Sequence, residues 1–279
     1  MTMKRILAAV MACVLVLSCA ACGTAEVKEV KSPEDFEGAK ISVQTATTAH
    51  ESLMDMEENG STVEILPYEK VTQCFDDLAL NRCDAVYVDS VVAAYYLADD
   101  DSTFQSVWTS DEGEPMGIVL KKGNTEMLEL VESAIDLMYY NGTIGEIAEK
   151  HFGTNVTEGV RTVTEEPVLD LSVLSTITEG KLTVGFEAGY PPMEYTDDSG
   201  LEYIGFDVDL AKAMSELFGL EVEFVNTSFD GIFAGLDKGQ YDMIIAAVSI
   251  TPERQEAYEM TEPYISNKLV IVTNKPEEK

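Results

Sequence analysis

Basic residues and histidines are scarce in this chain. Lysine and arginine together number 18 against 51 acidic residues, which gives a formal net charge of −33, and His50 and His151 are the only histidines. Nucleic-acid binding needs a basic surface that displaces counterions, so we exclude nucleic acid as a partner. With its histidines in unrelated segments, the sequence has no Ser-His-Asp set and no Cys/His/Asp cluster at metal-ligand spacing. We therefore expect no metal site and no cofactor.

Cysteines and long apolar runs are few as well. The chain has 5 cysteines, of which Cys74 and Cys83 lie beyond residue 22. An extracytoplasmic location would permit a bridge between these two. Two buried free thiols are the interpretation we prefer, and the bridge stays open as the alternative. Beyond residue 22, no stretch is long and apolar enough to cross a bilayer.

The first residues have the layout of a secretory signal peptide, which we assign to residues 1–22. A basic pair precedes the apolar run Ile6–Leu17, and small residues follow it. Such a run is too short for a mature transmembrane helix. The ending Cys19-Ala-Ala-Cys22-Gly resembles a bacterial lipoprotein signal. That resemblance implies a lipid on Cys22, with Cys19 as the weaker candidate.

From residue 38 onwards, short apolar segments alternate with segments of helical periodicity. Strands are expected at 41–43, 63–66, 83–88, 117–121, 182–186, 222–225, 243–248 and 269–272. Helical patterns follow most of them, and this alternation predicts parallel βαβ units. The polar stretch 101–115 is interpreted as a loop. The sequence therefore predicts two α/β lobes, each with a central, mostly parallel sheet flanked by helices.

The segment after the apolar run 243–248 has the features of an anion-binding site. Thr251 can cap a helix that begins at Pro252, and Arg254 falls in the first turn of that helix. A helix N-terminus and a guanidinium both favour a carboxylate ligand, and Ser249 adds a hydroxyl donor. An ordinary capped helix with a solvated arginine is the competing interpretation.

Other polar and aromatic residues follow predicted strands in the same way. In parallel sheets, ligands bind beyond the carboxyl ends of the strands. Each such residue alone has an ordinary role as a helix cap, a core residue or a solvated side chain. Because they all fall at strand ends, we prefer a shared site for a small zwitterion. These residues are Thr47, Thr48, Asp89, Glu187, Tyr190 and Phe229.

Longer motifs accompany these residues. In the second half of the chain they are GFEAGYPPMEY (185–195), IGFDVDLA (204–211), FDGIFAGL (229–236) and YDMIIAAVSITPER (241–254). In the first half they are QTATT (44–48), DAVYVD (84–89), NGTIGEI (141–147) and HFG (151–153). Together they closely resemble the polar amino-acid-binding proteins of ABC importers (extracellular solute-binding protein family 3). The resemblance implies a two-lobed, type II periplasmic-binding-protein fold with the ligand in the cleft between the lobes.

The resemblance assigns the α-carboxylate of an amino acid to one group of residues. Arg254, Ser249 and the backbone near Ala247 would bind it from one lobe. Thr48, and Thr47 beside it, would help from the other lobe. Relatives often have Gly or Ser where Ala247 stands, and Gly where Ala46 stands.

The rest of the amino acid is assigned to four further residues. By resemblance, Asp89 would bind the α-ammonium group, and Tyr190 and Phe229 would sandwich the side chain. Glu187 would meet the polar or cationic end of that side chain or share the ammonium group.

The order of the halves differs from that of the family. Its members begin with the part found here at 171–273 and continue into the part found at 32–152. The resemblance thus implies a circular permutation, cut in one of the two strands that cross between the lobes. The alternative is a truncated tandem array, or a swapped dimer, in which each half pairs with another molecule. The expected layout is signal peptide 1–22, tether 23–37, lobe 2 at 38–117, hinge return and terminal helices packing on lobe 1 at 118–153, linker joining the usual termini 154–170, lobe 1 at 171–273, and a tail at the cut hinge 274–279.

The function implied by the resemblance is transport rather than catalysis. The chain would capture a polar or cationic amino acid by lobe closure and deliver it to an ABC permease. We expect a monomer outside the cytoplasm, anchored to the outer face of the cell membrane by lipid on Cys22. The alternatives are a cyclohexadienyl-type dehydratase of the same fold, with Glu187 as general acid, or a sensor for a signalling partner.

Overall fold

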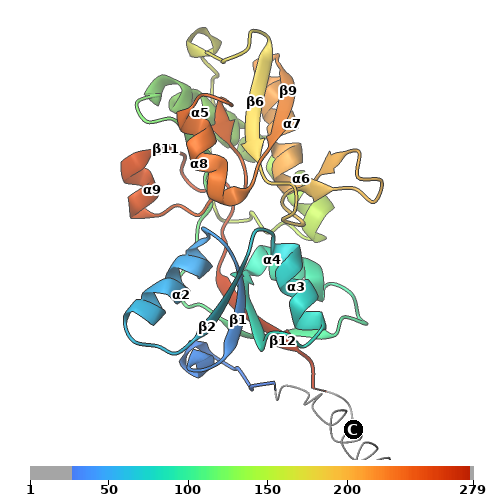
Figure 1. Cartoon of the computed structure of the whole chain (residues 1–279). Coiled ribbons are helices and arrows are strands. Elements are labelled where there is room, and N and C mark those ends of the chain that lie inside the picture. Colours follow the sequence, from blue (N-terminus) through green and yellow to red (C-terminus); the bar gives the residue numbers. More distant parts are fainter. Residues whose placement is uncertain (1–26, 277–279) are drawn as a thin grey trace, which may run out of the picture.

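Two five-stranded sheets, each flanked by helices, form the cores of two lobes stacked one above the other (Figure 1). The structure is a computed structural model of the chain and describes residues 27–276. The predicted signal peptide and Cys22 lie outside the described residues. The two-lobed α/β architecture predicted from the sequence is confirmed. No helix within residues 27–276 is long and apolar enough to cross a membrane.

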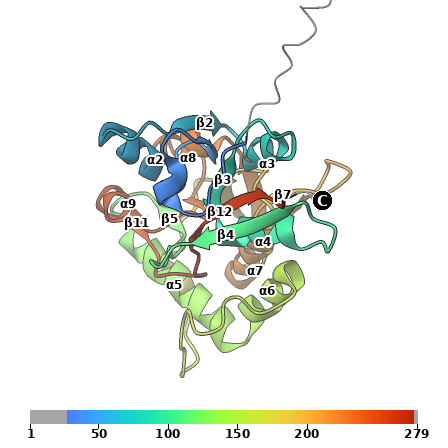
Figure 2. The ribbon, with the colours of Figure 1, turned by 90° about the horizontal axis from the view of Figure 1, so that it is seen from below.

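The lower lobe in Figure 1, lobe 2, has the strand order β2-β1-β3-β12-β4. Seen from below in Figure 2, β12 lies between β3 and β4. The strands are β1 (Lys40–Gln44), β2 (Glu64–Tyr68), β3 (Ala85–Asp89), β4 (Phe104–Thr109) and β12 (Leu269–Asn274). The helical elements are η1 (Pro33–Phe36), α2 (Thr48–Glu58), α3 (Val71–Ala79) and α4 (Ser90–Leu97).

The upper lobe, lobe 1, has the order β11-β5-β10-β6-β9 and a separate hairpin, β7-β8. The strands are β5 (Val119–Leu120), β6 (Lys181–Phe186), β7 (Tyr195–Thr196), β8 (Tyr203–Ile204), β9 (Glu221–Asn226), β10 (Met243–Ile244) and β11 (Glu259–Met260). The helical elements are α5 (Thr125–Tyr140), α6 (Thr143–Phe152), η2 (Leu171–Val173), α7 (Phe206–Phe218), α8 (Phe229–Asp237) and α9 (Pro252–Ala257).

The parallel pairing expected for both sheets holds only for part of each. β1 pairs in parallel with β2 and β3, and β6 does so with β9 and β10. β12 enters the sheet of lobe 2 from lobe 1, and β5 enters the sheet of lobe 1 from lobe 2. Each of these two strands runs antiparallel to both of its neighbours. Each sheet is therefore mixed. A βαβ connection returns the chain to the same end of the sheet and makes the next strand parallel. A segment that crosses from the other lobe enters at the opposite end, so its strand is antiparallel.

Two segments connect the lobes: residues 110–118 between β4 and β5, and residues 261–268 between β11 and β12. β12 thus belongs to the sheet of lobe 2, and the expected extent of lobe 1 to residue 273 is corrected. Both connections are continuous, so the expected cut in a crossing strand is wrong. After β12, Lys275 N donates to Thr103 O at 2.7 Å within lobe 2. Lys275 therefore lies in lobe 2, not at a cut hinge.

The strand β4 was not predicted from the sequence. β4 lies within the stretch 101–115, which we interpreted as a loop, yet it pairs with β12 along its length. It forms the edge of the sheet and none of its residues is fully buried. Edge strands carry polar residues on their solvent side, so their sequences lack a continuous apolar signal.

The described part of the expected tether packs on lobe 2. Val30 and Phe36 are 3% and 1% exposed and belong to the lobe 2 core. Lys28 N donates to Asp84 Oδ1 at 2.7 Å. Two apolar anchors within a charged stretch have no periodicity, so the sequence pattern did not reveal them. Residues 27–37 are therefore part of the lobe rather than a free tether.

The segment expected as a linker, 154–170, is also docked. Arg161 Nη1 lies 2.7 Å from Glu132 Oε2 and 2.7 Å from Asp136 Oδ1, both on α5. The same guanidinium donates to the carbonyls of Glu262 and Pro263, at 2.5 Å and 2.7 Å. The linker is thus fixed to α5 and to the start of the second crossing segment.

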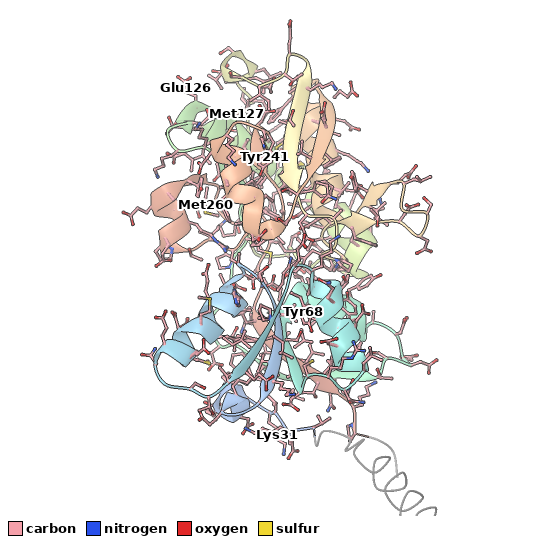
Figure 3. The ribbon with its side chains drawn as sticks, in the orientation of Figure 1. Lys31, Tyr68, Glu126, Met127, Tyr241 and Met260 are labelled. Carbon is pink, nitrogen blue, oxygen red and sulfur yellow. The ribbon has the colours of Figure 1, made fainter. Side chains whose placement is uncertain are left out.

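Glycines and one tyrosine fit together in the core of lobe 1. A Cβ added at Gly185 would lie 2.4 Å from the Tyr241 ring, and one at Gly235 would lie 2.2 Å from its hydroxyl. Figure 3 shows Tyr241 inside this lobe. Both glycines fall in the motifs singled out above, and their packing role explains them.

In lobe 2, Cys74 and Cys83 are free and buried, as expected, and burial raises the pKa of each thiol to about 12.

Candidate functional site

A narrow cavity between the lobes brings together every ligand-binding residue predicted from the sequence. From lobe 2 it is lined by Gln44, Thr47, Thr48 and Asp89. From lobe 1 it is lined by Glu187, Tyr190, Glu194, Phe229, Ala246, Ala247, Ser249 and Arg254. Gln44, Glu194 and Ala246 were not predicted. The ligand-binding role of each lining residue stays a prediction.

The local structure around Arg254 matches the sequence analysis. Thr251 caps α9 by accepting a hydrogen bond from Arg254 N at 3.2 Å, and Pro252 is the first helical residue. The Arg254 side chain is 10% exposed. Its Nη1 donates to Ser249 O at 3.0 Å, and its Nη2 donates to Ala46 O of lobe 2 at 3.3 Å. The arginine is buried and structured, so the solvated alternative is wrong.

The charge of Arg254 is only partly compensated. Among the described residues, the one carboxylate within 4.0 Å is Glu51, which is 60% exposed. The guanidinium carbon lies 5.9 Å from the ring centroid of Phe229 and 5.4 Å from that of Phe233. Burial lowers the pKa of Arg254. A buried cation bonded mainly to neutral carbonyls and aromatic faces is suited to an anionic ligand group.

On the other side of the cavity, Asp89 is the last residue of β3 and is 7% exposed. It precedes α4 but makes no side-chain capping bond, so the alternative role as a helix cap is wrong. Its Oδ1 accepts from Asn267 Nδ2 at 2.5 Å, and its Oδ2 accepts from the hydroxyl of Tyr190 in lobe 1. Burial, and then the nearby Glu114 carboxylate, raise the pKa of Asp89 well above its usual value.

The two predicted aromatic walls are both buried. Tyr190 and Phe229 are 6% and 8% exposed, and Phe229 opens α8. The Tyr190 hydroxyl reaches across to Asp89, so this ring spans the gap between the lobes. Burial, and then the charge of Asp89, raise the pKa of Tyr190.

Carboxylates gather at the end of the cavity where Glu187 lies. Glu187 Oε2 accepts from Gln44 Nε2 of lobe 2 at 2.8 Å, whereas Glu187 Oε1 has no hydrogen-bond partner. Glu194 Oε2 has none either, and the two residues are 2% and 1% exposed. Burial raises the pKa of Glu187, against the opposite effects of Gln44 and Lys70, and burial with Asp207 raises that of Glu194.

Two alanines at the site have left-handed backbones. The φ angles of Ala46 and Ala247 are 61° and 48°, in the region that glycine adopts most easily. Asp207 holds Ala247 in place, because its Oδ2 accepts from Ala247 N at 2.7 Å and from Tyr264 Oη at 2.9 Å. Burial raises the pKa of Asp207 to about 7. Strained backbone at Ala247 and at Ala46, the acceptor of Arg254, is typical of a functional site.

The two threonines differ in what they contact. Thr47 Oγ1 caps α2 by accepting from His50 N at 3.2 Å, and it donates to Gln44 O at 2.8 Å. Thr48 Oγ1 donates to Glu114 in the first crossing segment. Glu114 was missed by the sequence analysis, since a single acidic residue in a polar stretch gives no signal. Gln44 could have been found, because it is the first residue of the QTATT motif.

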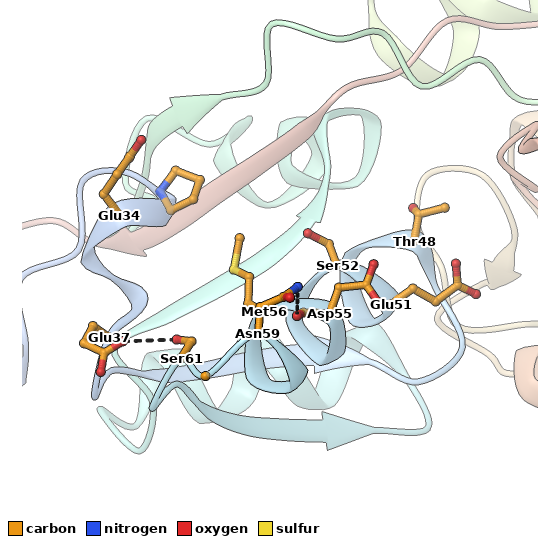
Figure 4. A pocket seen from close by; sticks show the side chains of 11 residues that line it. Glu34, Glu37, Thr48, Glu51, Ser52, Asp55, Met56, Asn59 and Ser61 are labelled. Atoms are coloured by element: carbon orange, nitrogen blue, oxygen red, sulfur yellow. Dashed lines mark hydrogen bonds between the residues drawn. The ribbon is translucent and has the colours of Figure 1, made fainter.

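A larger recess, of about 880 Å³, lies beside α2 on lobe 2 (Figure 4). Acidic side chains from η1 and α2 line it, and Thr48 is the only predicted site residue among its lining residues. It combines no cation with these carboxylates, so the cavity between the lobes remains the candidate site.

A two-lobed α/β fold with a charged cavity between the lobes is the architecture of a solute-binding protein. Residues 182–279 match the family model described as bacterial extracellular solute-binding proteins, family 3. This match confirms the resemblance for the motifs in the second half of the chain.

Individual relatives match parts of the chain. ABC transporter arginine-binding protein 1 of Escherichia coli (strain K12) is 38% identical over 95 residues, 34% of this chain and 39% of that protein. The L-cystine-binding protein TcyJ of the same organism is 30% identical over 135 residues, 46% of this chain and 50% of that protein. A solved ancestral arginine-binding protein bound to arginine is 44% identical over 28% of this chain and 34% of its own, with a TM-score of 0.28. The chain thus spans half or less of the length of these relatives.

Proposed function

We propose that this protein captures a free amino acid between its lobes and delivers it to an ABC permease. One observation carries the proposal: Arg254 of lobe 1 and Asp89 of lobe 2 line the same cavity. A cation and an anion on opposite walls match the two poles of a zwitterion. The relatives support this class of ligand, since their names specify binding of arginine, cystine and histidine.

The proposed mechanism is capture by closure. Arg254 and Ser249 bind the α-carboxylate, and Asp89 binds the ammonium group, so the amino acid joins the lobes. Polar contacts bridge the same gap in the structure, such as Arg254 to Ala46 and Gln44 to Glu187. A ligand shifts the population toward closure by making more favourable bonds there. For roughly ten heavy atoms, ligand efficiency allows about −8 to −12 kcal/mol, or micromolar to nanomolar affinity.

The charges that line the cavity favour a cationic side chain. If the carboxylate pairs with Arg254 and the ammonium group with Asp89, the buried Glu187 and Glu194 still form no ion pair among the described residues, although Lys70 lies near Glu187. Each has one carboxylate oxygen with no hydrogen-bond partner. A buried carboxylate is stabilised by a charged or hydrogen-bonded partner, which a guanidinium or an ammonium group supplies. We therefore propose a polar or cationic amino acid as ligand, with a cation favoured.

The test is a thermal-shift screen of the chain from residue 23 onwards against the twenty amino acids, followed by calorimetry. A ligand that binds only the folded state raises its stability by about 2.7 kcal/mol at one hundred times its Kd. We expect the largest shifts from arginine, lysine or glutamine. No shift and no heat with any amino acid would refute the proposal.

We further propose a monomer anchored outside the cytoplasm by lipid on Cys22, with the halves exchanged by circular permutation. In its support, β12 pairs with β3 and β4 of the same chain, so the two halves complete one another's sheets. Residues 154–170 would join the usual termini on the surface of lobe 1. A single acyl chain binds a membrane only weakly, so firm anchoring would need a second signal.

A dehydratase is the second candidate. A solved ancestral cyclohexadienyl dehydratase is 39% identical over 28% of this chain. Glu187, the general acid of this alternative, lines the cavity, and burial raises its pKa, as a general acid requires. We nevertheless favour a binding protein that is not an enzyme, because the charged walls suit a zwitterion. Formation of product from prephenate or arogenate would favour the dehydratase instead.

A further inference from the structure

The two crossing segments lie side by side and share a polar pair that the proposed site does not yet include. Glu114 N donates to Asn267 O at 2.7 Å, and Met116 N donates to Ile265 O at 3.1 Å. The side chains of Glu114 and Asn267 are bonded as well, with Asn267 Nδ2 lying 2.9 Å from Glu114 Oε2. Glu114 and Asn267 therefore join the two crossing segments that connect the lobes.

Asn267 has a fixed orientation. It is 2% exposed, and its Oδ1 accepts from Ser90 Oγ at 2.9 Å and from Val91 N at 3.3 Å. A backbone N–H can only donate, so the amide oxygen has to face α4. The Nδ2 group consequently donates to Asp89 and Glu114, at 2.5 Å and 2.9 Å. Asn267 thus holds two carboxylates next to each other.

Glu114 connects this arrangement to the other predicted contact of lobe 2. Its Oε1 accepts from the hydroxyl of Thr48, and its Oε2 accepts from Asn267. Thr48 and Asp89 both line the cavity, whereas Glu114 does not. One carboxylate on a crossing segment is therefore bonded to Thr48 directly and linked to Asp89 through Asn267.

We propose that Glu114 is a positioning residue for ammonium recognition, which holds Asp89 and Thr48 in place and adds a second negative charge behind Asp89. This inference rests on the proposed function, since it concerns the same ligand. Two carboxylates bonded to one amide repel each other in a buried site, and a cation placed against Asp89 relieves that repulsion. Glu114 therefore makes the site more attractive to an ammonium group without touching it.

The charged and titratable groups that face Asp89 come from several elements. They are Glu114 on the first crossing segment, Tyr190 and Glu194 after β6, and Arg254 on α9. Burial and Glu114 both raise the pKa of Asp89. The ionised form of Asp89 binds the ammonium group, so affinity is full above this pKa and falls as the pH drops through it. Removing the charge of Glu114 should move that fall to lower pH.

The test compares wild type with Glu114→Gln by calorimetry between pH 4 and 8. L-Arginine and L-glutamine are the probes, because their charges stay nearly constant in this range. E114Q keeps the size of the side chain and loses its charge. We expect about tenfold weaker binding at pH 7, which corresponds to about 1.4 kcal/mol. We also expect the acid midpoint, the pH at which half of the affinity is lost on acidification, to shift to lower pH. A purely structural role would weaken binding at every pH without moving the midpoint.

Three further variants sharpen the test. Glu112→Gln removes an exposed charge from the same segment and should bind like wild type. Glu114→Asp keeps the charge and should keep the acid midpoint near that of wild type, even if its affinity falls. Asp89→Asn should remove the part of the acid fall that Asp89 causes and leave the part that comes from Glu187 and Glu194. If wild type binds and E114Q has the same affinity and midpoint, the inference is refuted while the proposed function stands. If wild type binds neither probe, both are refuted.

Discussion

Replacing Arg254 by lysine tests the carboxylate side of the site while keeping its charge. The Arg254 side chain is 10% exposed and donates to Ser249 O and Ala46 O, one in each lobe. It also lies against the rings of Phe229 and Phe233. A lysine ammonium has no planar fork, so it cannot keep both carbonyl bonds and still bind a carboxylate through two parallel bonds.

The expected loss follows from these contacts. A hydrogen bond to a charged group contributes about 1.5–3 kcal/mol, and a cation–π contact contributes about 0.5–1 kcal/mol. Losing one bond to the ligand and part of the aromatic contact should cost about 2–4 kcal/mol in binding. That corresponds to roughly 30- to 1000-fold weaker affinity.

The assay is calorimetry with the best amino acid from the screen, at pH 7. Arg82→Lys is the matched control, because Arg82 is 65% exposed, pairs with Asp77 at 3.3 Å and lies outside the lining of the cavity. R82K should bind like wild type. Wild-type affinity in R254K would refute the assignment of Arg254 to the carboxylate, and an equal loss in R82K would show that the effect is not specific to the site.

Two further predictions concern stability. Burial raises the pKa of Asp89, so the ionised form is disfavoured in the fold and wild-type stability should fall as the pH rises above about 4, the pKa of an unfolded aspartate. Asp89→Asn should lessen this fall in urea unfolding at pH 4, 6 and 8, because the raised pKa values of Glu187, Glu194 and Asp207 leave the rest of it in place. The same variant should lose about 100-fold or more in amino-acid affinity; an unchanged pH dependence would contradict the assignment. Arg161→Met should lower the free energy of unfolding by about 1–3 kcal/mol, reduced from the buried-pair value because Glu132 and Asp136 are 24% and 39% exposed. A loss below about 0.5 kcal/mol in urea unfolding would mean that the linker does not dock through Arg161.

Local patterns in the sequence determined much of this protein. Apolar segments alternating with helical periodicity predicted the βαβ units, and the ends of those strands placed the predicted site residues at one cavity. The turn through Thr251, Pro252 and Arg254 was likewise readable, since a helix cap depends only on neighbouring residues. Such features require no knowledge of which strands pair.

The tertiary structure alone decided the features that depend on distant partners. β12 belongs to lobe 2 because it pairs with β3 and β4, and polar β4 is a strand only because β12 lies beside it. The contacts of Glu114 with Thr48 and Asn267 join residues that are 66 and 153 positions apart. Val30, Phe36 and Arg161 act as anchors only through the surfaces that they meet. Each of these properties belongs to a contact between remote segments, and a contact of that kind leaves no periodicity in either segment from which it could be predicted.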